Sequence, residues 1–313
     1  RPTQVEVADT LFGLQTSEAD WSGAKATLQS KVRTGQLPRD VGKRREAVLA
    51  LADAQVAEAE GKLDEARASA YRANKLVPGL VPAAVMAARL HGDAGEGRAA
   101  VNSLKIAWGQ SPHPDLAAAF AKLAPDESPS ERRTRFEALL RKNPTHPESK
   151  MTAAELALAD EDFPGARKAL GDLVETRATT RVMALMAAIE KGEGAEDKVV
   201  RGWLAKALSA QRDETWICTV CKTTQDYWTP ICPECGAFDT LEWATPPSTA
   251  EGSGPTTAML PLIVGALEDK SEPAEETDES TPETPVEAAD TSDAAEVTEP
   301  AADQEDKAKV SAA

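Results

Sequence analysis

The sequence predicts an all-α protein: a solenoid of helical hairpins over residues 1–210, then a small four-cysteine domain and an acidic tail. Three observations carry this prediction. Through residues 1–210, apolar residues recur at three- and four-residue spacing, which is the period of a helix. All four cysteines of the chain lie within 18 residues. The last 46 residues hold 16 acids, three lysines and no aromatic residue.

The helical region is rich in Ala, Leu, Arg, Glu and Lys, and glycine, proline or aspartate separates its short helices. Extended alternation of β-branched residues, which would indicate strands, does not occur there. These breaks divide the region into five predicted helix pairs and a less regular sixth at the start of the chain. The pairs lie near residues 43–76, 79–110, 113–143, 146–175 and 178–210, and the sixth lies near 3–34.

A 34-residue period runs through two of these pairs. Glycine, proline and alanine recur at this interval: Gly61 with Gly95, Pro78 with Pro112, Ala54 with Ala88, Ala66 with Ala100, and Ala73 with Ala107. Small side chains let two helices approach closely, and proline stops the second helix. The unit resembles the tetratricopeptide repeat, with a partial third copy in Ala154, Phe163, Ala166 and Leu170. The resemblance implies a tetratricopeptide-like solenoid whose groove binds a protein segment, and an ordinary α-helical domain is the alternative.

The repeats show no catalytic constellation, so the sequence predicts a protein that is not an enzyme, with no catalytic or organic cofactor-binding residues. Its three histidines are His91, His113 and His146. His113 and His146 lie beside prolines where helix pairs begin, and His91 ends a helix, so capping or exposure explains them. The glycines at 192 and 194 lack the strand and the spacing of a dinucleotide-binding loop.

The cysteines form two C-x-x-C knuckles, Cys218/Cys221 and Cys232/Cys235, separated by ten residues. This spacing sets four thiolates around one tetrahedral ion, so it predicts a metal site rather than two disulfides. A domain of residues 213–245 has too small a core to fold alone, so we expect metal binding to be coupled to its folding. Zn²⁺ is the favoured ion. Iron is the alternative, because a rubredoxin-like ribbon holds iron with the same four thiolates, although its knuckles normally end in Gly and Lys222 follows Cys221 here.

Charge argues against nucleic acid as a partner. The net charge is −17, and residues 213–243 hold six acids and one base, whereas nucleic-acid binding needs a basic surface. The cysteine spacing also matches a family of RNA- and ubiquitin-binding fingers, but the acidic surface disfavours RNA. The tryptophans Trp216, Trp228 and Trp243 are expected to pack the small core of the ribbon over the metal.

Residues 246–313 are predicted to be a disordered acidic tail, because they hold too few apolar residues to offset the conformational entropy of folding. An apolar island at 257–267 precedes the most acidic part of this tail, and such islands dock into a groove of the same chain or of a partner. The chain has no run of 18 or more apolar residues, so it predicts no membrane span.

The combination of divergent repeats with a rubredoxin-like ribbon resembles the bacterial HemY family. The matching segments are Asp20-Trp21, residues 78–84, His113 to Leu116, His146 to Ser149, and the ribbon from Trp216 to Trp243. The resemblance implies a helper role in protohaem (porphyrin) biosynthesis at the cytoplasmic face of the inner membrane. It also implies an N-terminal membrane anchor, which this chain does not contain. The layout is also similar to that of the LapB adaptors, in which the ribbon packs on the repeats.

These observations lead to one functional hypothesis and two alternatives. The protein is expected to be a membrane-associated scaffold whose groove holds a partner, such as the late haem-pathway enzyme ferrochelatase, with the ribbon fixing the C-terminal end of the groove. The first alternative is electron transfer by iron in the ribbon. The second is carriage of haem or porphyrin, which would use His91 or Cys232.

Overall fold

The computed structural model describes residues 2–247. The chain divides into two compact units, Arg1–Ala258 and Met259–Ala313, and the described residues belong to the first. Apart from Pro246 and Pro247, the predicted acidic tail and its apolar island at 257–267 lie outside the described residues. Those two predictions therefore stay predictions, and the fold concerns the repeats and the ribbon.

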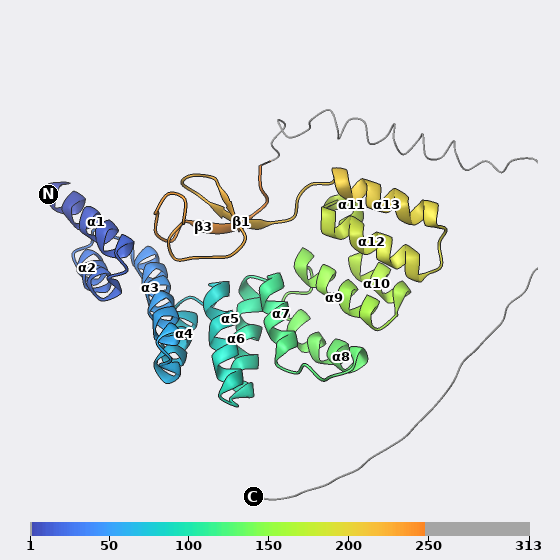
Figure 1. Cartoon of the computed structure of the whole chain (residues 1–313), viewed down its shortest axis with the longest axis horizontal. Helices are drawn as coiled ribbons and strands as arrows, with labels where there is room; N and C mark the ends of the chain where they lie inside the picture. The colour runs from blue at the N-terminus through green and yellow to red at the C-terminus, as the bar shows by residue number, and fades with distance from the viewer. Residues whose placement is uncertain (1, 248–313) are drawn as a thin grey trace, which may run out of the picture. The chain divides into compact units, whose positions relative to one another are not determined.

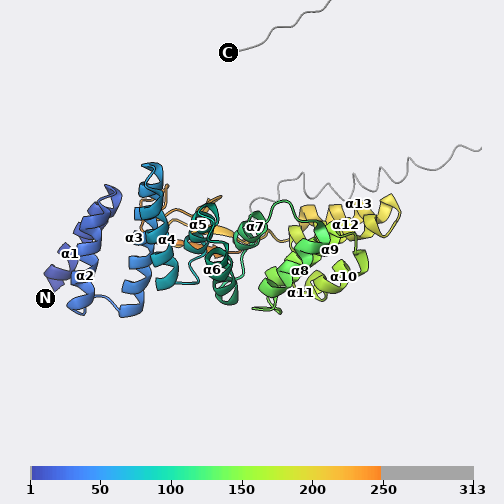
Figure 2. The same ribbon diagram turned by 90° about the horizontal axis from the view of Figure 1, so that it is seen from below.

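Among the described residues, thirteen helices are followed by three short strands, as the sequence predicts (Figure 1). The helices are α1 (Pro2–Ser17), α2 (Trp21–Arg33), α3 (Arg39–Ala59), α4 (Leu63–Leu76), α5 (Val81–Asp93), α6 (Gly97–Gln110), α7 (Pro114–Lys122), α8 (Pro129–Leu140), α9 (Pro147–Ala159), α10 (Phe163–Leu170), α11 (Leu173–Thr176), α12 (Thr180–Gly192) and α13 (Asp197–Ser209). Five of the six predicted pairs are packed hairpins, whereas in the predicted pair at 113–143 α7 packs mainly on α5 and α6, and α8 on α6 and α9. Helix α11 is an additional single turn. Successive pairs pack side by side in chain order (Figures 1 and 2).

The predicted 34-residue period coincides with the turns and the core of two hairpins. Gly61 and Gly95 lie at the turns between α3 and α4 and between α5 and α6, with φ of +77° and +76°. Glycine adopts this left-handed conformation without the steric penalty of a Cβ atom. The aligned alanines are all fully buried where the helices cross: Ala54, Ala66, Ala73, Ala88, Ala100 and Ala107. The all-α hairpin repeat that the sequence predicts is therefore confirmed.

The third copy of this turn uses a glutamate. Glu161, seven residues after the buried Ala154, has φ of +56°, although side chains with a Cβ atom are strained there. We expect Glu161→Gly to raise the free energy of unfolding by up to about 1 kcal/mol, and Gly95→Ala, at the equivalent turn, to lower it by about 1 kcal/mol. Urea denaturation of both variants measures these shifts. Changes of the same sign would contradict the assignment of these turns as equivalent.

Polar contacts between buried side chains join the middle hairpins to the C-terminal ones. The indole Nε1 of Trp108 in α6 donates to Ser149 Oγ in α9 at 3.0 Å. One position earlier, Glu148 pairs with Arg181 of α12 at 2.7 Å. Burial raises the pKa of Glu148, and the Arg181 guanidinium opposes that rise. Glu148 and Ser149 thus connect α9 with α12 and with α6.

The ribbon is a three-stranded antiparallel sheet in the order β2-β1-β3. Its strands are β1 (Thr215–Cys218), β2 (Thr224–Gln225) and β3 (Leu241–Ala244). In the register of the sheet, Trp216 of β1 lies opposite Trp243 of β3. The two knuckles lie in the turns beside these strands, so the sheet brings their thiols together.

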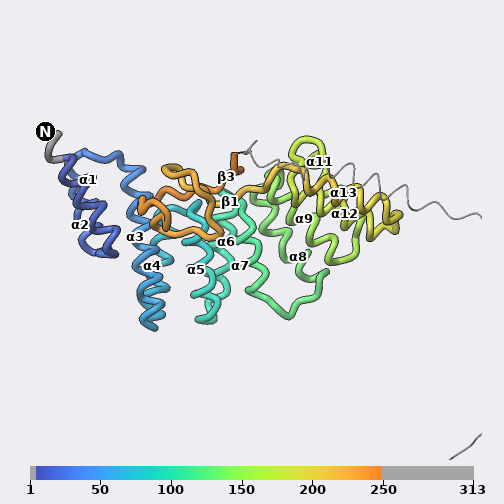
Figure 3. Tube along the Cα trace, turned by 45° about the horizontal axis from the view of Figure 1, so that its top comes forward, coloured from blue at the N-terminus to red at the C-terminus, as the bar shows by residue number. Residues whose placement is uncertain are grey.

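The ribbon does not lie at the C-terminal end of the repeats, and the expectation that it fixes that end of the groove is wrong. It folds back beside α3, α5 and α7 (Figures 1 and 3). Trp216, Trp228 and Leu241 are buried in one apolar cluster with residues of α3, α4 and α5. The tryptophans therefore pack against the repeats as well as over the knuckles. Packing on the repeats removes these apolar side chains from water, which favours this placement.

In the part of the chain that the structure describes, no helix is long and apolar enough to cross a membrane.

Candidate metal centre and binding groove

The four cysteine thiols converge at one point of the ribbon. The Sγ atoms of Cys218, Cys221, Cys232 and Cys235 all lie within 4.8 Å of one another. Two pairs, Cys218 with Cys235 and Cys221 with Cys232, are separated by 3.7 Å. A tetrahedral ion with metal–sulfur bonds of about 2.3 Å needs sulfur atoms about 3.8 Å apart. The geometry of the thiols therefore fits a single four-coordinate metal ion.

The two knuckles have the same backbone geometry. After the second cysteine of each knuckle, Lys222 and Gly236 adopt left-handed conformations, with φ of +60° and +71°. Each donates its backbone N–H, at 2.9 Å, to the carbonyl of the first cysteine, Cys218 or Cys232. Lys222 therefore adopts the backbone conformation of the glycine that is usual at this position of a rubredoxin-like knuckle. Its identity does not separate zinc from iron.

Hydrogen bonds prepare two of the thiols for ionisation. Burial raises the pKa of Cys218. The Thr240 hydroxyl and backbone N–H groups of the knuckle outweigh burial and lower this pKa to about 6. The hydroxyl and N–H of Thr223 lower the pKa of Cys221. Thiolates are the form that binds a metal ion. The contacts of the first knuckle thus favour the thiolate form of both of its cysteines.

The fourth thiol shows why a cation is needed. The backbone N–H of Ala237 lowers the pKa of Cys235, but burial and the three neighbouring thiols outweigh it and raise this pKa to about 12. Four thiols this close cannot all ionise, because each new negative charge repels the others. A divalent cation at their centre removes that repulsion. The donor set and its spacing therefore fit a metal ion such as zinc or iron.

His113 fixes the ribbon to the repeats. The imidazole is 2% exposed, and its ring centroid lies 4.1 Å from that of Trp243 and 5.3 Å from that of Trp216. Its Nδ1 accepts the backbone N–H of Asp115 and so caps α7, which confirms the predicted capping role. Burial lowers the pKa of His113 to about 4. The contact with the tryptophans was not predicted, because more than 100 residues separate the partners.

Two further contacts hold the other edge of the ribbon. Arg44 at the start of α3 forms an ion pair with Asp239, whose carboxylate is nearly buried, at 3.0 Å. Phe12 of α1 meets Phe238 edge-to-face, with ring centroids 5.3 Å apart. The ribbon therefore contacts α1, α3, α4 and α5 and the N-cap residue of α7.

Beyond the ribbon, a groove of about 730 Å³ runs along the second half of α5, the start of α6 and the length of α7. Its apolar lining includes Val85, Val101, Ala118, Ala119 and Leu123. The residues at 115, 118, 119 and 122 share one face of α7, because they lie three or four positions apart. Small side chains there leave room for the side chains of a bound segment.

Charged residues surround this groove. Arg89, a lining residue, forms an ion pair with Glu58 at 2.6 Å, so its charge is already paired. Burial raises the pKa of Asp115, another lining residue. Lys122 is exposed at the edge of the groove and forms no ion pair among the described residues. It is available to a carboxylate of a bound segment.

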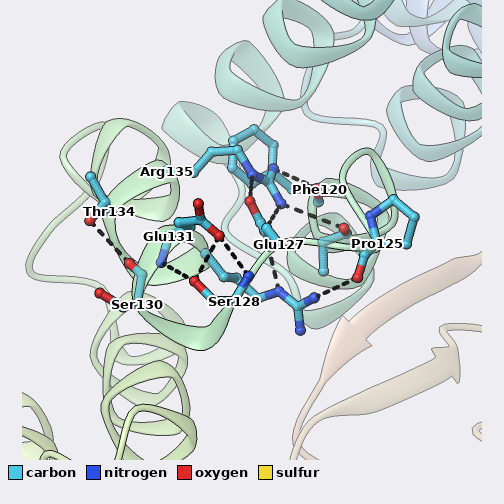
Figure 4. Close-up of polar contacts among 10 residues, drawn as sticks. Phe120, Pro125, Glu127, Ser128, Ser130, Glu131, Thr134 and Arg135 are labelled. Atoms are coloured by element: carbon cyan, nitrogen blue, oxygen red, sulfur yellow. Dashed lines mark hydrogen bonds and ion pairs between the residues drawn. The ribbon is translucent and has the colours of Figure 1, made fainter.

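Arg135 of α8 supports the wall of the groove (Figure 4). Its Nε donates to the Glu127 carboxylate at 2.7 Å, and its Nη1 donates to the Phe120 carbonyl at 2.8 Å. The guanidinium also lies over the Phe120 ring, 4.5 Å from its centroid. The Ser128 and Glu131 capping box starts α8 beside it. These contacts fix the turn between α7 and α8.

The remaining histidines have structural surroundings. His146 caps α9 by accepting the N–H of Glu148, as the sequence predicts. His91 Nδ1 lies 2.5 Å from a Glu96 carboxylate oxygen, and its ring meets Tyr71 edge-to-face. Neither His91 nor Cys232 lines the large groove.

Comparisons with known proteins give one relative and a distant structural likeness. No protein-family model matches the chain. "Probable magnetosome protein Mms48" from Magnetospirillum gryphiswaldense is 26% identical over 259 residues, covering 80% of this chain and 58% of that protein. The chain thus spans less than two thirds of the relative's length. A solved tetratricopeptide repeat protein from Parabacteroides merdae covers 66% of this chain and 99% of its own, at 14% identity and a TM-score of 0.31.

Proposed function

We propose that the protein is a non-enzymatic scaffold that binds a partner protein in the groove of α5, α6 and α7. The groove itself carries this proposal: it is concave, lined by apolar and small side chains, and framed by charged ones. Arrays of helical hairpins typically bind protein segments on such a surface. The ribbon packs on α3, α4 and α5, and no ribbon residue lines the groove.

The lining indicates the chemistry of the segment that binds. Val85, Val101 and Leu123 suit apolar side chains, and Ala118 and Ala119 let a helix or an extended chain approach closely. Lys122 favours a carboxylate on the segment. We therefore infer an amphipathic segment that carries an acidic residue beside its apolar positions.

We infer that Cys218, Cys221, Cys232 and Cys235 bind Zn²⁺ in a structural role. The aromatic side chains over the knuckles are buried against the repeats, which supports an architectural use of the metal. Iron with electron transfer is the second candidate, because the backbone conformation of both knuckles suits either ion. Elemental analysis and colour separate the two, because ferric four-thiolate sites are red and zinc sites are colourless.

The cellular role of this scaffold is inferred from its likeness to other proteins. The likeness to the HemY family supports protohaem biosynthesis at the inner membrane, with ferrochelatase as one partner to test. The relative is named "Probable magnetosome protein Mms48", which supports a role at the magnetosome. A binding assay with purified ferrochelatase tests the first setting, and failure to bind at micromolar concentration would remove this partner.

A matched pair of variants tests the groove. Ala118 is exposed in the groove and Ala68 is exposed on α4, outside it. Ala118→Arg is expected to block the groove and to weaken partner binding at least about tenfold, or about 1.4 kcal/mol, whereas Ala68→Arg is expected to bind as wild type. Partners captured by the wild type are quantified against both variants by titration. Equal binding by all three proteins would exclude this groove as the binding site.

A further inference from the structure

Most of the charged residues that line the groove of α5, α6 and α7 already have partners. Arg89 lies between two carboxylates, those of Glu58 at 2.6 Å and of Asp93 at 3.7 Å. Arg135 forms an ion pair with Glu127. The charges of these side chains are therefore largely compensated within the protein.

Two opposite charges stay uncompensated, and both are on α7. Lys122 is exposed and forms no ion pair in the described part of the chain. Asp115 is also exposed, and the one basic group within 4 Å of its carboxylate among the described residues is His113, at 3.6 Å. Burial lowers the pKa of His113 to about 4, so this imidazole carries no charge at neutral pH. The groove therefore offers a bound segment one free carboxylate and one free ammonium group.

Small side chains separate the two free charges. Asp115 and Lys122 lie seven positions apart, so they share one face of α7 and are about 10 Å apart along its axis. Ala118 and Ala119 lie between them on this face, and both line the groove. At the start of α6, Gly97 adds space, since no atom lies within 4 Å of the place where a Cβ atom would be. Two helices approach to 8–10 Å where such small residues meet, so the groove has room for a helix.

The order of the two charges selects the direction of a bound helix. A helix that runs antiparallel to α7 places its first turn beside Lys122 and its last turn beside Asp115. An acid in that first turn and a base in that last turn pair with these residues, and they also stabilise the bound helix through its macrodipole. A parallel helix needs a base in its first turn and an acid in its last turn, which its macrodipole disfavours.

We propose that the groove binds an amphipathic helix of a partner protein antiparallel to α7, with an acid, apolar residues three and four positions later, and a base seven positions after the acid. This inference rests on the proposed function, because it gives the chemistry and the direction of the segment in the same groove. Helix α7 itself carries Asp115, Ala118, Ala119 and Lys122 in this order. It forms a wall of the groove, however, so a second copy of the chain presents the same recessed surface and is not the occupant.

Selection from a display library of helical peptides tests the charges and the direction. The library fixes two adjacent leucines and randomises the position three residues before the first and the position three residues after the second. The full chain is expected to enrich peptides with an acid at the earlier position and a base at the later one. In titrations of synthetic peptides, exchange of the two charges is expected to weaken binding at least about fivefold.

Substitutions in α7 assign each preference to one residue. Lys122→Glu is expected to remove the preference for an acid at the earlier position, and Asp115→Asn to remove the preference for a base at the later one. Lys142→Glu, at an exposed lysine outside the groove, is the matched control and is expected to enrich the same peptides as the wild type. All three substitutions are at exposed positions, and far-UV circular dichroism checks that the helices persist.

The remaining outcomes separate this inference from the proposed function. Enriched peptides that lose binding in Ala118→Arg but show no order of charges would overturn the inference and leave the groove as the binding site. Peptides with the base first would overturn the antiparallel direction. Failure to enrich any peptide whose binding depends on Ala118 would overturn both. A wild-type dimer that Lys122→Glu dissociates, measured by sedimentation velocity, would assign the groove to a second copy of the chain.

Discussion

Cys218→Ser is expected to abolish stable metal binding and to unfold the ribbon. Loss of an outer-sphere partner alone costs about 10- to 100-fold in metal affinity, so the loss of a ligand costs more. Structural zinc contributes about 10–16 kcal/mol of apparent binding free energy in small metal-dependent domains. The ribbon has a core too small to replace that contribution. Removal of the metal by a chelator is expected to give the same result.

The effect extends to the repeats. Trp216, Trp228 and Leu241 are buried in the apolar cluster that contains residues of α3, α4 and α5. Unfolding of the ribbon exposes this side of the cluster to water, so the melting temperature of the helices is expected to fall. Tryptophan fluorescence, which shifts to the red as the ribbon tryptophans become exposed, and circular dichroism at 222 nm measure the two parts separately.

Val220→Ser is the matched control, because Val220 lies between the two cysteines of the same knuckle and is 62% exposed. It is expected to keep wild-type metal content, fluorescence and melting temperature. A Cys218→Ser protein with unchanged tryptophan fluorescence would show that the ribbon folds without its metal. That result would remove the structural role of the metal and leave the groove untouched.

The second large effect is a loss of stability between pH 6.5 and pH 4 that His113 causes. Burial between Trp216 and Trp243 lowers the pKa of His113 to about 4, whereas an unfolded histidine has a pKa of about 6.5. The unfolded chain therefore binds the proton first as the pH falls. The contribution of His113 to the free energy of unfolding is complete well above pH 6.5, and about 3 kcal/mol of it is lost by pH 4.

His113→Phe isolates this contribution. Phenylalanine keeps a ring between the tryptophans but cannot take up a proton, and it loses the cap of α7, which costs about 1 kcal/mol at every pH. The difference in stability between the two proteins is therefore expected to depend on pH. The Asp115 carboxylate, 3.6 Å from Nδ1, is common to both proteins, so it does not mask the difference. Parallel stability curves from urea denaturation at pH 7, 6, 5 and 4.5 would contradict the assignment.

The repeat fold follows from local sequence signals. Gly61 and Gly95 mark turns that need a positive φ, and the aligned alanines mark helix crossings, so spacing alone predicts the hairpins. The convergence of the four thiols follows from the knuckle spacing in the same way. Each of these features depends on residues close in the chain or repeated at a fixed interval.

The placement of the ribbon could not be predicted in this way. It depends on pairs such as Arg44 with Asp239 and His113 with Trp216, which share no period and no motif. The left-handed conformation of Lys222 also has no signal in its residue type, because the hydrogen bond to the Cys218 carbonyl imposes it. The groove likewise depends on how α5, α6 and α7 pack together, which no local motif predicts.

The docking of the ribbon on the first hairpins sets an order of events during synthesis. Arg44 and its partner Asp239 are 195 residues apart in the chain. At about 5–20 residues per second, the ribosome takes about 10–40 s to make the second partner after the first. Throughout that interval the nascent N-terminal hairpins present an uncovered apolar surface. A chaperone that holds this surface during translation would therefore compete with the ribbon, and translation that stalls before residue 215 would leave the surface open.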